Sequence, residues 1–350
     1  MSLFCTSPLF SSGRSYKLTY SMMDDLKSPN YTDIRYKIQS DAERYTWTAY
    51  FVFGLLSSFI GDTLILIATL QKDTFKLNKF LVAIIQHIAV SDLANGAHFI
   101  LPTIIALLED KWIMGEALCY ARVYIAYVFY PAGMSFISVL TTSKFLIMKY
   151  PTRVSNWSPR RAHQVCAFVW VFLLLNPILF LVVDKNDLAF DYRIYTCEYS
   201  FQSNTSKNIM FPLLLFFISA LVPNILIIAT TVPTLKYLAL ARRSAKRVKG
   251  SVPWQGALTV GLTSIVYCIS TLPFTFYKIL IGIGIMTEDP NNMDQVNYYR
   301  ASYFLLMMNL VFNFYIYIVT IRSFRRFIYS KFSSAVPVSV NLNFSSVQEP

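Results

Sequence analysis

The sequence predicts an all-α integral membrane protein, built as a bundle of seven transmembrane helices with a short amphipathic eighth helix. Two observations predict this fold class. Of the 350 residues, 55% are hydrophobic and only 14% are charged, whereas a soluble domain carries about a quarter charged residues. In addition, seven apolar stretches alternate with polar loops, and each stretch is long enough to cross a bilayer.

The third apolar stretch runs from Cys119 to Pro151, and we expect the other helices to pack around it. It ends on a small cationic cluster, Lys144 and Lys149, just before Pro151. A helix of this length, rising about 1.5 Å per residue, exceeds a hydrocarbon core of about 30 Å. We therefore expect it to cross the membrane at a tilt.

The other elements follow from the same pattern of apolar stretches. The expected spans are residues 46–70, 80–108, 119–151, 163–183, 208–240, 252–285 and 298–321. This divides the chain into an extracellular tail (1–45), the seven-helix bundle (46–321), an amphipathic segment (322–332) and a cytoplasmic tail (333–350). The amphipathic segment, RSFRRFIYSKF, suits a helix that lies on the membrane surface.

Lysine and arginine concentrate on alternate loops. The loops expected inside, residues 71–79, 144–161, 236–249 and 322–331, hold eighteen Lys or Arg and one acid, Asp73. The loops expected outside, residues 109–122, 184–207 and 288–300, hold ten acids and six bases. The positive-inside rule then predicts a multi-pass plasma-membrane protein with an extracellular N-terminus and a cytoplasmic C-terminus. The net charge of +12 reflects this topology and contact with membrane lipid, and it gives no case for a nucleic-acid partner.

Two glycosylation sequons, at Asn30 and Asn204, fall on the expected outer side. The five cysteines form no CxxC pair, which argues against a zinc site. The three histidines, His87, His98 and His163, are too scattered for a metal cluster, and no nucleophile–base pair is evident. We therefore do not expect an enzyme.

With these landmarks, residues 46–331 resemble the rhodopsin-like (class A) G-protein-coupled receptors. The residues that carry the resemblance, in chain order, are Asp92 in IAVSDLA, Trp112, Cys119, Trp170, Pro223, Pro273, Asn309, the Asn313–Tyr317 segment NFYIY, Phe324 and Arg325. The resemblance implies a disulfide between Cys119 and Cys197. It also implies an extracellular ligand and a heterotrimeric G protein as partners.

The chain departs from the family pattern at four places, as a divergent, orphan-type member would. Ser143-Lys144-Phe145 replaces Asp-Arg-Tyr, Ser270-Thr271-Leu272-Pro273 lacks the tryptophan of CWxP, Phe314 replaces the proline of NPxxY, and Asp62 replaces the helix-one asparagine. Lys144 keeps a cation but loses the planar fork of arginine. The G-protein-coupling surface implied by the resemblance comprises Ser143, Lys144, Phe145, Arg242, Arg243 and Tyr317; its basic part also suits anionic lipid.

The resemblance places a ligand pocket between the outer halves of the third, fifth, sixth and seventh helices. Its expected lining is His98, Ala126, Tyr127, Tyr130, Phe274, Tyr277, Lys278, Tyr303 and Met307. Ala126 stands where amine receptors have aspartate, and Met307 stands where opsins have the retinal lysine. We therefore expect a peptide or a non-amine small molecule. Lys278 either attracts an anionic ligand group or extends to the outer interface, and we favour the second reading.

Four polar residues are expected to meet in the middle of the bundle: Asp62, Asp92, Asn309 and Asn313. Ionisable groups at that depth usually have a partner or a function. In the family this place holds a sodium ion beneath the residue matching Asp92. Two nearby carboxylates favour such a cation or leave one of them protonated; the alternative is a hydrogen-bond network that only packs helices. No other cofactor or metal is expected.

The leading interpretation is thus a receptor that transmits ligand binding to G proteins. The altered Ser143-Lys144-Phe145 and Phe314 positions leave a second one, a receptor-like scavenger or scaffold that does not couple. A transporter is disfavoured because the chain shows no repeated halves and no pair of broken apolar segments.

Overall fold

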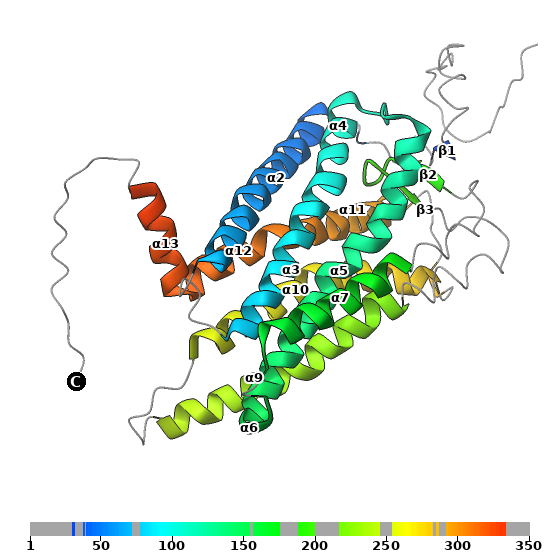
Figure 1. The fold of residues 1–350 in the computed structure, drawn as a ribbon. Coiled ribbons are helices and arrows are strands. Elements are labelled where there is room, and N and C mark those ends of the chain that lie inside the picture. The colour runs from blue at the N-terminus through cyan, green and yellow to red at the C-terminus, as the bar shows by residue number, and fades with distance from the viewer. Residues whose placement is uncertain are drawn as a thin grey trace, which may run out of the picture.

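The long apolar stretches form helices because the lipid of a bilayer offers no hydrogen-bond partners to the backbone. In a helix, the backbone N–H and C=O groups bond to one another. A computed structural model describes residues 30–31, 38, 40–71, 78–154, 157–175, 188–199, 217–245, 254–282, 285–286 and 292–333. The helices, shown in Figure 1, are α2 (Asp41–Leu70), α3 (Lys79–Asn95), η3 (Gly96–Ile100), α4 (Leu101–Glu109), α5 (Gly115–Lys149), α6 (Pro151–Val154), α7 (Pro159–Leu175), η6 (Phe217–Leu221), α9 (Val222–Ala245), α10 (Trp254–Gly282), α11 (Met293–Met307), α12 (Asn309–Thr320) and α13 (Arg322–Ser333).

Five described helical spans are long and apolar enough to cross a membrane. They are Asp41–Leu70, Lys79–Glu109, Gly115–Lys149, Ile218–Leu240 and Leu258–Ile281, and the α11–α12 pair, bent by 44°, makes a sixth. With α7, whose described part has 17 residues, they form the predicted seven-helix bundle (Figure 1). The outward faces carry exposed apolar side chains such as Ile60, Phe168 and Ile269, as a surface in contact with lipid requires.

The second span contains a π-helical turn, η3, between α3 and α4. Pro102 follows it at the start of α4, where a proline has no N–H to offer to the preceding turn. Asn95, at the end of α3, donates from its side chain to the carbonyl of Phe129 in α5 at 3.0 Å. This bond fixes the second span to α5 next to the π-helical turn.

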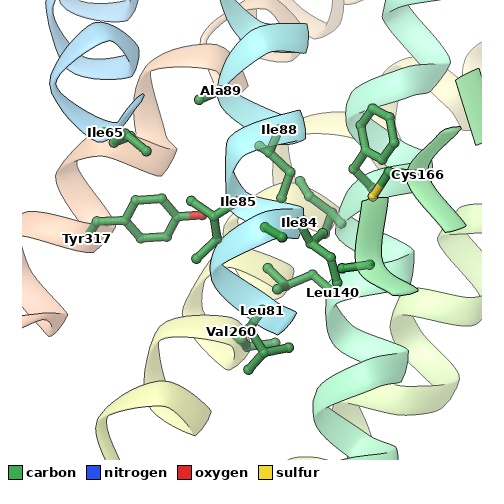
Figure 2. Close-up of a cluster of buried hydrophobic side chains, with 14 of the residues drawn as sticks. Ile65, Leu81, Ile84, Ile85, Ile88, Ala89, Leu140, Cys166, Val260 and Tyr317 are labelled. Atoms are coloured by element: carbon green, nitrogen blue, oxygen red, sulfur yellow. The ribbon is translucent and has the colours of Figure 1, made fainter. Parts of the chain in front are cut away.

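Two clusters of buried apolar side chains fill the bundle. The inner cluster joins α3, α5, α7, α10 and α12, and Figure 2 shows Ile84, Leu140, Val260 and Tyr317 within it. The outer cluster includes aromatic residues of α10 and α11 together with Cys119 and Cys197. α5 contributes to both clusters and so connects the outer half of the bundle to the inner half.

A three-stranded sheet covers the end of the bundle that the sequence predicts to be extracellular, called the outer end below. Strands β2 (Leu188–Asp191) and β3 (Thr196–Tyr199) pair antiparallel, with Phe190 opposite Cys197. Strand β1 (Asn30–Tyr31) pairs in parallel with Ala189 and Phe190 of β2. Part of the N-terminal segment, which we expected only as an extracellular tail, is therefore paired with strand β2.

The first and third helices begin earlier than their apolar stretches. α2 begins at Asp41 rather than residue 46, because Ser40 caps it by accepting a hydrogen bond from the Glu43 backbone N–H at 3.4 Å. Acidic residues in the first turn suit a helix N-terminus. α5 begins at Gly115, whose φ of +79° favours glycine, and not at Cys119.

The eighth helix is α13, which follows α12 after Ile321. It is amphipathic: Phe324 and Phe327 are buried, whereas Arg326 and Lys331 are exposed. Arg325 donates to the carbonyls of Ile318 and Val319 at 3.5 and 3.4 Å. These bonds satisfy carbonyls at the C-terminal end of α12, where basic side chains are favourable.

Candidate functional site

A cavity of about 80 Å³ lies in the outer half of the bundle. Its lining comes from the second span, α5, β3, α10 and α11, and comprises Phe99, Arg122, Val123, Ala126, Tyr127, Tyr130, Thr196, Cys197, Glu198, Phe274, Lys278, Tyr303, Leu306 and Met307. Seven of the nine residues expected at the ligand pocket lie there. The lining is mostly apolar and aromatic with a few convergent polar groups, which is the composition of a small-molecule site.

The other two expected residues lie apart from this lining. His98 bonds through Nδ1 to the carbonyl of Ala94 and packs against Phe129. Tyr277 is buried against the rings of Tyr298 and Tyr299. Both side chains contribute to packing around the cavity and are not among its lining residues.

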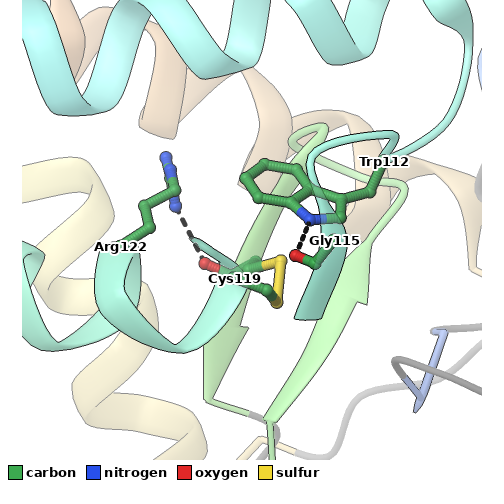
Figure 3. The surroundings of a disulfide bond; sticks show 5 residues. Trp112, Gly115, Cys119 and Arg122 are labelled. Carbon is green, nitrogen blue, oxygen red and sulfur yellow. Dashed lines mark hydrogen bonds between the residues drawn. A yellow bond between two sulfur atoms is a disulfide. The ribbon is translucent and has the colours of Figure 1, made fainter. Parts of the chain in front are cut away.

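A disulfide closes one side of the cavity. Cys119 at the start of α5 is bonded to Cys197 in β3, as the resemblance implies. Figure 3 shows Trp112 beside it, with the indole N–H donating to the carbonyl of Gly115 at 2.8 Å. Because Cys197 and its two neighbours in β3 line the cavity, the disulfide holds this strand over it.

Arg122 is a cavity residue that the sequence reasoning missed. Its side chain donates from Nη1 to the carbonyl of Cys197 at 2.8 Å (Figure 3) and from Nη2 to the Tyr303 hydroxyl at 3.4 Å. The guanidinium lies 4.4 Å from the centre of the Phe99 ring, at the distance of a cation–π contact. Arg122 is 3% exposed, so the cavity has a buried cation in its wall.

Lys278 is the second cation of the cavity, and our preferred reading of it was wrong. It does not extend to the outer interface: it is 7% exposed, and its Nζ lies 3.3 Å from Glu198 Oε2. The ammonium also lies 4.9 Å from the centre of the Tyr299 ring. Tyr299 donates its hydroxyl to the same carboxylate. The charge of Lys278 is therefore paired within the cavity wall.

Ion pairs tie the outer end of α2 to the elements around the cavity. Arg44 lies 2.7 Å from both Asp41 and Asp110. The hydroxyl of Tyr195, in the β2–β3 turn, donates to Asp110 at 2.9 Å. Burial, and to a smaller extent the charge of the Asp110 carboxylate, raise the pKa of the Tyr195 phenol. The hydroxyl therefore stays protonated and donates at neutral pH. Arg300 of α11 lies 3.4 Å from Glu43.

Of the four polar residues expected to meet in the middle of the bundle, three lie together: Asp92, Asn309 and Asn313. Asn313 donates to Asp92 Oδ2 at 2.8 Å, and Asp92 and Asn309 line one cavity of about 30 Å³. Asp62 accepts from Ser58 at 2.7 Å and interacts electrostatically with Asp92, but it does not line this cavity. Its other oxygen, Oδ1, is buried without a hydrogen-bond partner among the described residues.

The inner end of the bundle holds the expected coupling residues. Ser143, Lys144 and Tyr317 are buried, and Phe145 packs near Tyr237 with ring centres 6.3 Å apart. Lys144 has no ion-pair or hydrogen-bond partner among the described residues. Arg242 and Arg243 lie in α9, but their side chains are outside the described part of the structure, as is Asn204. Asn30 is described only as a residue of β1.

One bond at this end was not expected from the sequence. Thr259 of α10 donates to the hydroxyl of Thr320 of α12 at 2.8 Å, and both residues are buried. A second threonine pair, Thr230 of α9 and Thr141 of α5, is bonded at 3.1 Å. Hydroxyl pairs of this kind join neighbouring helices where side chains are shielded from water.

Comparisons with known proteins agree on the architecture. Residues 61–317 match the family described as 7 transmembrane receptor (rhodopsin family). The chain is 28% identical to cysteinyl leukotriene receptor 2 of Mus musculus over 234 residues, covering 63% of this chain and 72% of that receptor. It is 28% identical to G-protein coupled receptor 183-A of Danio rerio over 89 residues, covering 25% of this chain and 24% of that receptor. This chain thus spans about a quarter of the latter relative's length.

A solved structure shows the same fold. The crystal structure of squid rhodopsin matches with a TM-score of 0.70 at 17% sequence identity. The match covers 87% of this chain and 85% of that one. The seven-helix fold expected from the sequence is confirmed.

Proposed function

Because the chain belongs to the rhodopsin family of seven-transmembrane receptors, we propose that it is a cell-surface receptor that transmits binding in its outer cavity to a G protein at its inner face. As a member of that family it is a multi-pass membrane protein and a receptor, not an enzyme. The observation that carries the proposal is the outer cavity, which is lined by helices that continue to the inner face. The proposed ligand is a non-amine molecule, because Ala126 lines the cavity where amine receptors of the family have an aspartate, and the carboxylate of Glu198 is paired with Lys278.

The geometry of α5 supports this transmission. Ala126 lines the cavity and Lys144 lies near the inner end of the same unbroken helix. At about 1.5 Å per residue the two are about 27 Å apart. An agonist that prefers one packing of the bundle shifts the equilibrium toward it, and the inner ends of α5, α9 and α10 then open to the G protein.

Lys144 takes the part of the family's arginine in this proposal. The residue before it, Ser143, cannot restrain it by an ion pair as a carboxylate would. A different contact, the buried Thr259–Thr320 bond, joins the inner ends of α10 and α12. We propose that this bond favours the resting state.

We also propose a sodium ion in the small cavity beside Asp92. Its lining includes four residues with side-chain oxygen atoms that could bind a cation, Asp92, Asn95, Thr271 and Asn309. A hard cation prefers oxygen ligands. The volume of about 30 Å³ suffices for a single ion or water, which needs about 10–15 Å³. These residues therefore fit a monovalent cation, which would offset the charge of the buried carboxylates.

The proposed orientation has the N-terminus and the β1–β3 sheet outside. It is supported by the charge asymmetry of the loops, with eighteen bases and one acid on the expected inner side. Asn30 and Asn204 then carry glycans, and the third sequon, Asn156-Trp157-Ser158 on the expected inner loop 144–161, does not. Finding glycan on Asn156 alone would reverse this orientation.

A second candidate is a receptor that binds ligand without coupling. Its support is the residue pattern at the inner face, where Ser143-Lys144-Phe145 and Phe314 replace the family's Asp-Arg-Tyr and proline. Such a protein would still bind ligand in the outer cavity and internalise with it.

The test of the leading proposal links the cavity to the G protein. Membranes containing the full-length receptor are assayed for nucleotide exchange on a panel of heterotrimeric G proteins. An Ala126→Trp variant, which fills the cavity, is compared with Leu118→Trp on the exposed side of the same helix. We expect Ala126→Trp alone to change the exchange rate at equal surface expression. Equal rates for both variants and the wild type would contradict the proposal.

A further inference from the structure

The charges in the wall of the outer cavity do not balance. Two cations, Arg122 and Lys278, and one acid, Glu198, line it. Glu198 is engaged by Lys278 at 3.3 Å and by the hydroxyl of Tyr299. Among the described residues no carboxylate lies within ion-pair distance of Arg122, so one positive charge remains uncompensated.

The polar contacts of Arg122 are also incomplete. A guanidinium has five N–H groups, and two of them donate to the Cys197 carbonyl and the Tyr303 hydroxyl. Both acceptors are neutral. The Nε atom is buried without any acceptor in the described part of the chain. A buried cation in this condition is costly unless an anion pairs with it.

The space beside Arg122 is small and aromatic. The cavity of about 80 Å³ is well below the roughly 300–1,000 Å³ of a typical drug-sized site. Phe99, Tyr130, Phe274 and Tyr303 contribute rings to its wall. Such a space suits a narrow apolar or aromatic stem, and it disfavours a bulky folded peptide.

We propose that the cavity takes a small carboxylic acid whose carboxylate pairs with Arg122 and whose apolar stem lies among these rings. This inference rests on the proposed function, because it names the ligand class of the same cavity. A carboxylate supplies the one negative charge that the wall lacks. It also matches the planar N–H fork of arginine, which lysine cannot do.

The experiment measures binding without any signalling step. The full-length receptor is purified in detergent, and its thermal unfolding midpoint is recorded with phenylpropanoate, phenylbutanoate and phenylhexanoate. The primary amide of each acid, which has nearly the same shape and no charge, is the matched probe. We expect at least one acid to raise the midpoint in a concentration-dependent way and its amide to leave it unchanged.

Two variants test whether Arg122 causes the preference for the acid over its amide. Arg122→Gln removes the cation, and we expect affinity for the acid to fall about 10- to 100-fold, as for loss of a hydrogen-bonded charge pair. Arg122→Lys keeps the charge without the fork, and we expect a smaller loss. Lys149→Gln, at the inner end of the same helix, should bind as the wild type does. Each shift is referred to the ligand-free midpoint of the same variant.

Three results would overturn the inference: equal stabilisation by an acid and its amide, wild-type affinity in Arg122→Gln, or no shift with any acid of the series. Two other results distinguish failure of the proposed G-protein coupling from failure of the proposed ligand class. If the acids bind through Arg122 but no G protein responds, the ligand class stands and coupling does not. If a neutral agonist drives exchange equally in wild type and Arg122→Gln, coupling stands and the carboxylate does not.

Discussion

Thr259 of α10 and Thr320 of α12 are joined by a buried hydrogen bond of 2.8 Å at the inner end of the bundle. In the proposed mechanism, opening toward a G protein moves the inner end of α10, and this bond would oppose that movement. A buried hydroxyl pair contributes about 1 kcal/mol net. That is enough to shift a two-state equilibrium about fivefold, since 1.4 kcal/mol corresponds to about tenfold.

Thr259→Val should therefore raise agonist-free G-protein activation, up to about fivefold. Valine keeps the shape of threonine and removes the donor. Thr263→Val, one turn further along α10, is the matched control because the Thr263 hydroxyl is buried without a partner in the described structure. Nucleotide exchange at equal surface expression is the measurement. A Thr259→Val receptor no more active than Thr263→Val would show that this bond does not restrain the resting state.

Gly61 of α2 lies directly against Phe314 of α12. A Cβ atom at Gly61 would come within 2.5 Å of Phe314 Cγ, far inside van der Waals contact. Gly61→Ala should lower the thermal unfolding midpoint, at a cost of about 1–3 kcal/mol for overpacking. Gly133→Ala should be tolerated better, because its Cβ would meet only Asp92 Oδ1 at 3.8 Å.

Phe314→Ala should relieve the Gly61→Ala defect when the two are combined. The double variant tests whether the cost arises at this contact, since residues in direct contact give non-additive changes in stability. If the two changes are simply additive, the close approach of α2 and α12 is not the cause.

Loss of the Cys119–Cys197 disulfide should destabilise the outer half of the receptor. The bond joins residues 78 positions apart, and removal of a native disulfide costs about 2–5 kcal/mol. Cys119→Ser, Cys197→Ser and the double variant should lose surface expression and unfold at a lower temperature by similar amounts. A double variant with the wild-type midpoint would mean that the bond is dispensable.

Sodium should stabilise the receptor through Asp92. The thermal midpoint is expected to rise in sodium chloride relative to choline chloride at equal ionic strength, because the small polar cavity would admit sodium and is too small for choline. Asp92→Asn should abolish this difference, whereas Asp294→Asn at the exposed start of α11 should not. Equal midpoints of the wild type in the two salts would contradict the sodium proposal.

The sequence predicts the bundle well because hydropathy and helical length are local properties. It also places Asp92 and Asn313 near one another, through the resemblance, and they are bonded at 2.8 Å. The starts of helices are harder to place. The first turn of α2 is polar and capped by Ser40, so a boundary drawn where the apolar stretch begins falls too late.

The polar contacts of the cavity could not be predicted from local pattern. Arg122 was counted as an outer-loop base, although it lies one turn before Ala126 on the same helix face, which is the signal that could have placed it in the cavity. The partner of Lys278 is Glu198, next to Cys197 in the sequence but in a different element. Pairings between distant elements depend on tertiary structure, which periodicity along one helix does not report.

The most direct test of G-protein coupling compares agonist-free nucleotide exchange in membranes with wild-type receptor, Lys144→Ala receptor and no receptor. Lys144 is 6% exposed, and it has no ion-pair partner among the described residues. Because no ion pair restrains Lys144 in the described structure, we expect membranes with wild-type receptor to exchange nucleotide faster than receptor-free membranes. Lys144→Ala should return it to the background at equal surface density. Exchange equal to the background for every G protein tested, or an equal rate in Lys144→Ala, would contradict coupling through Lys144.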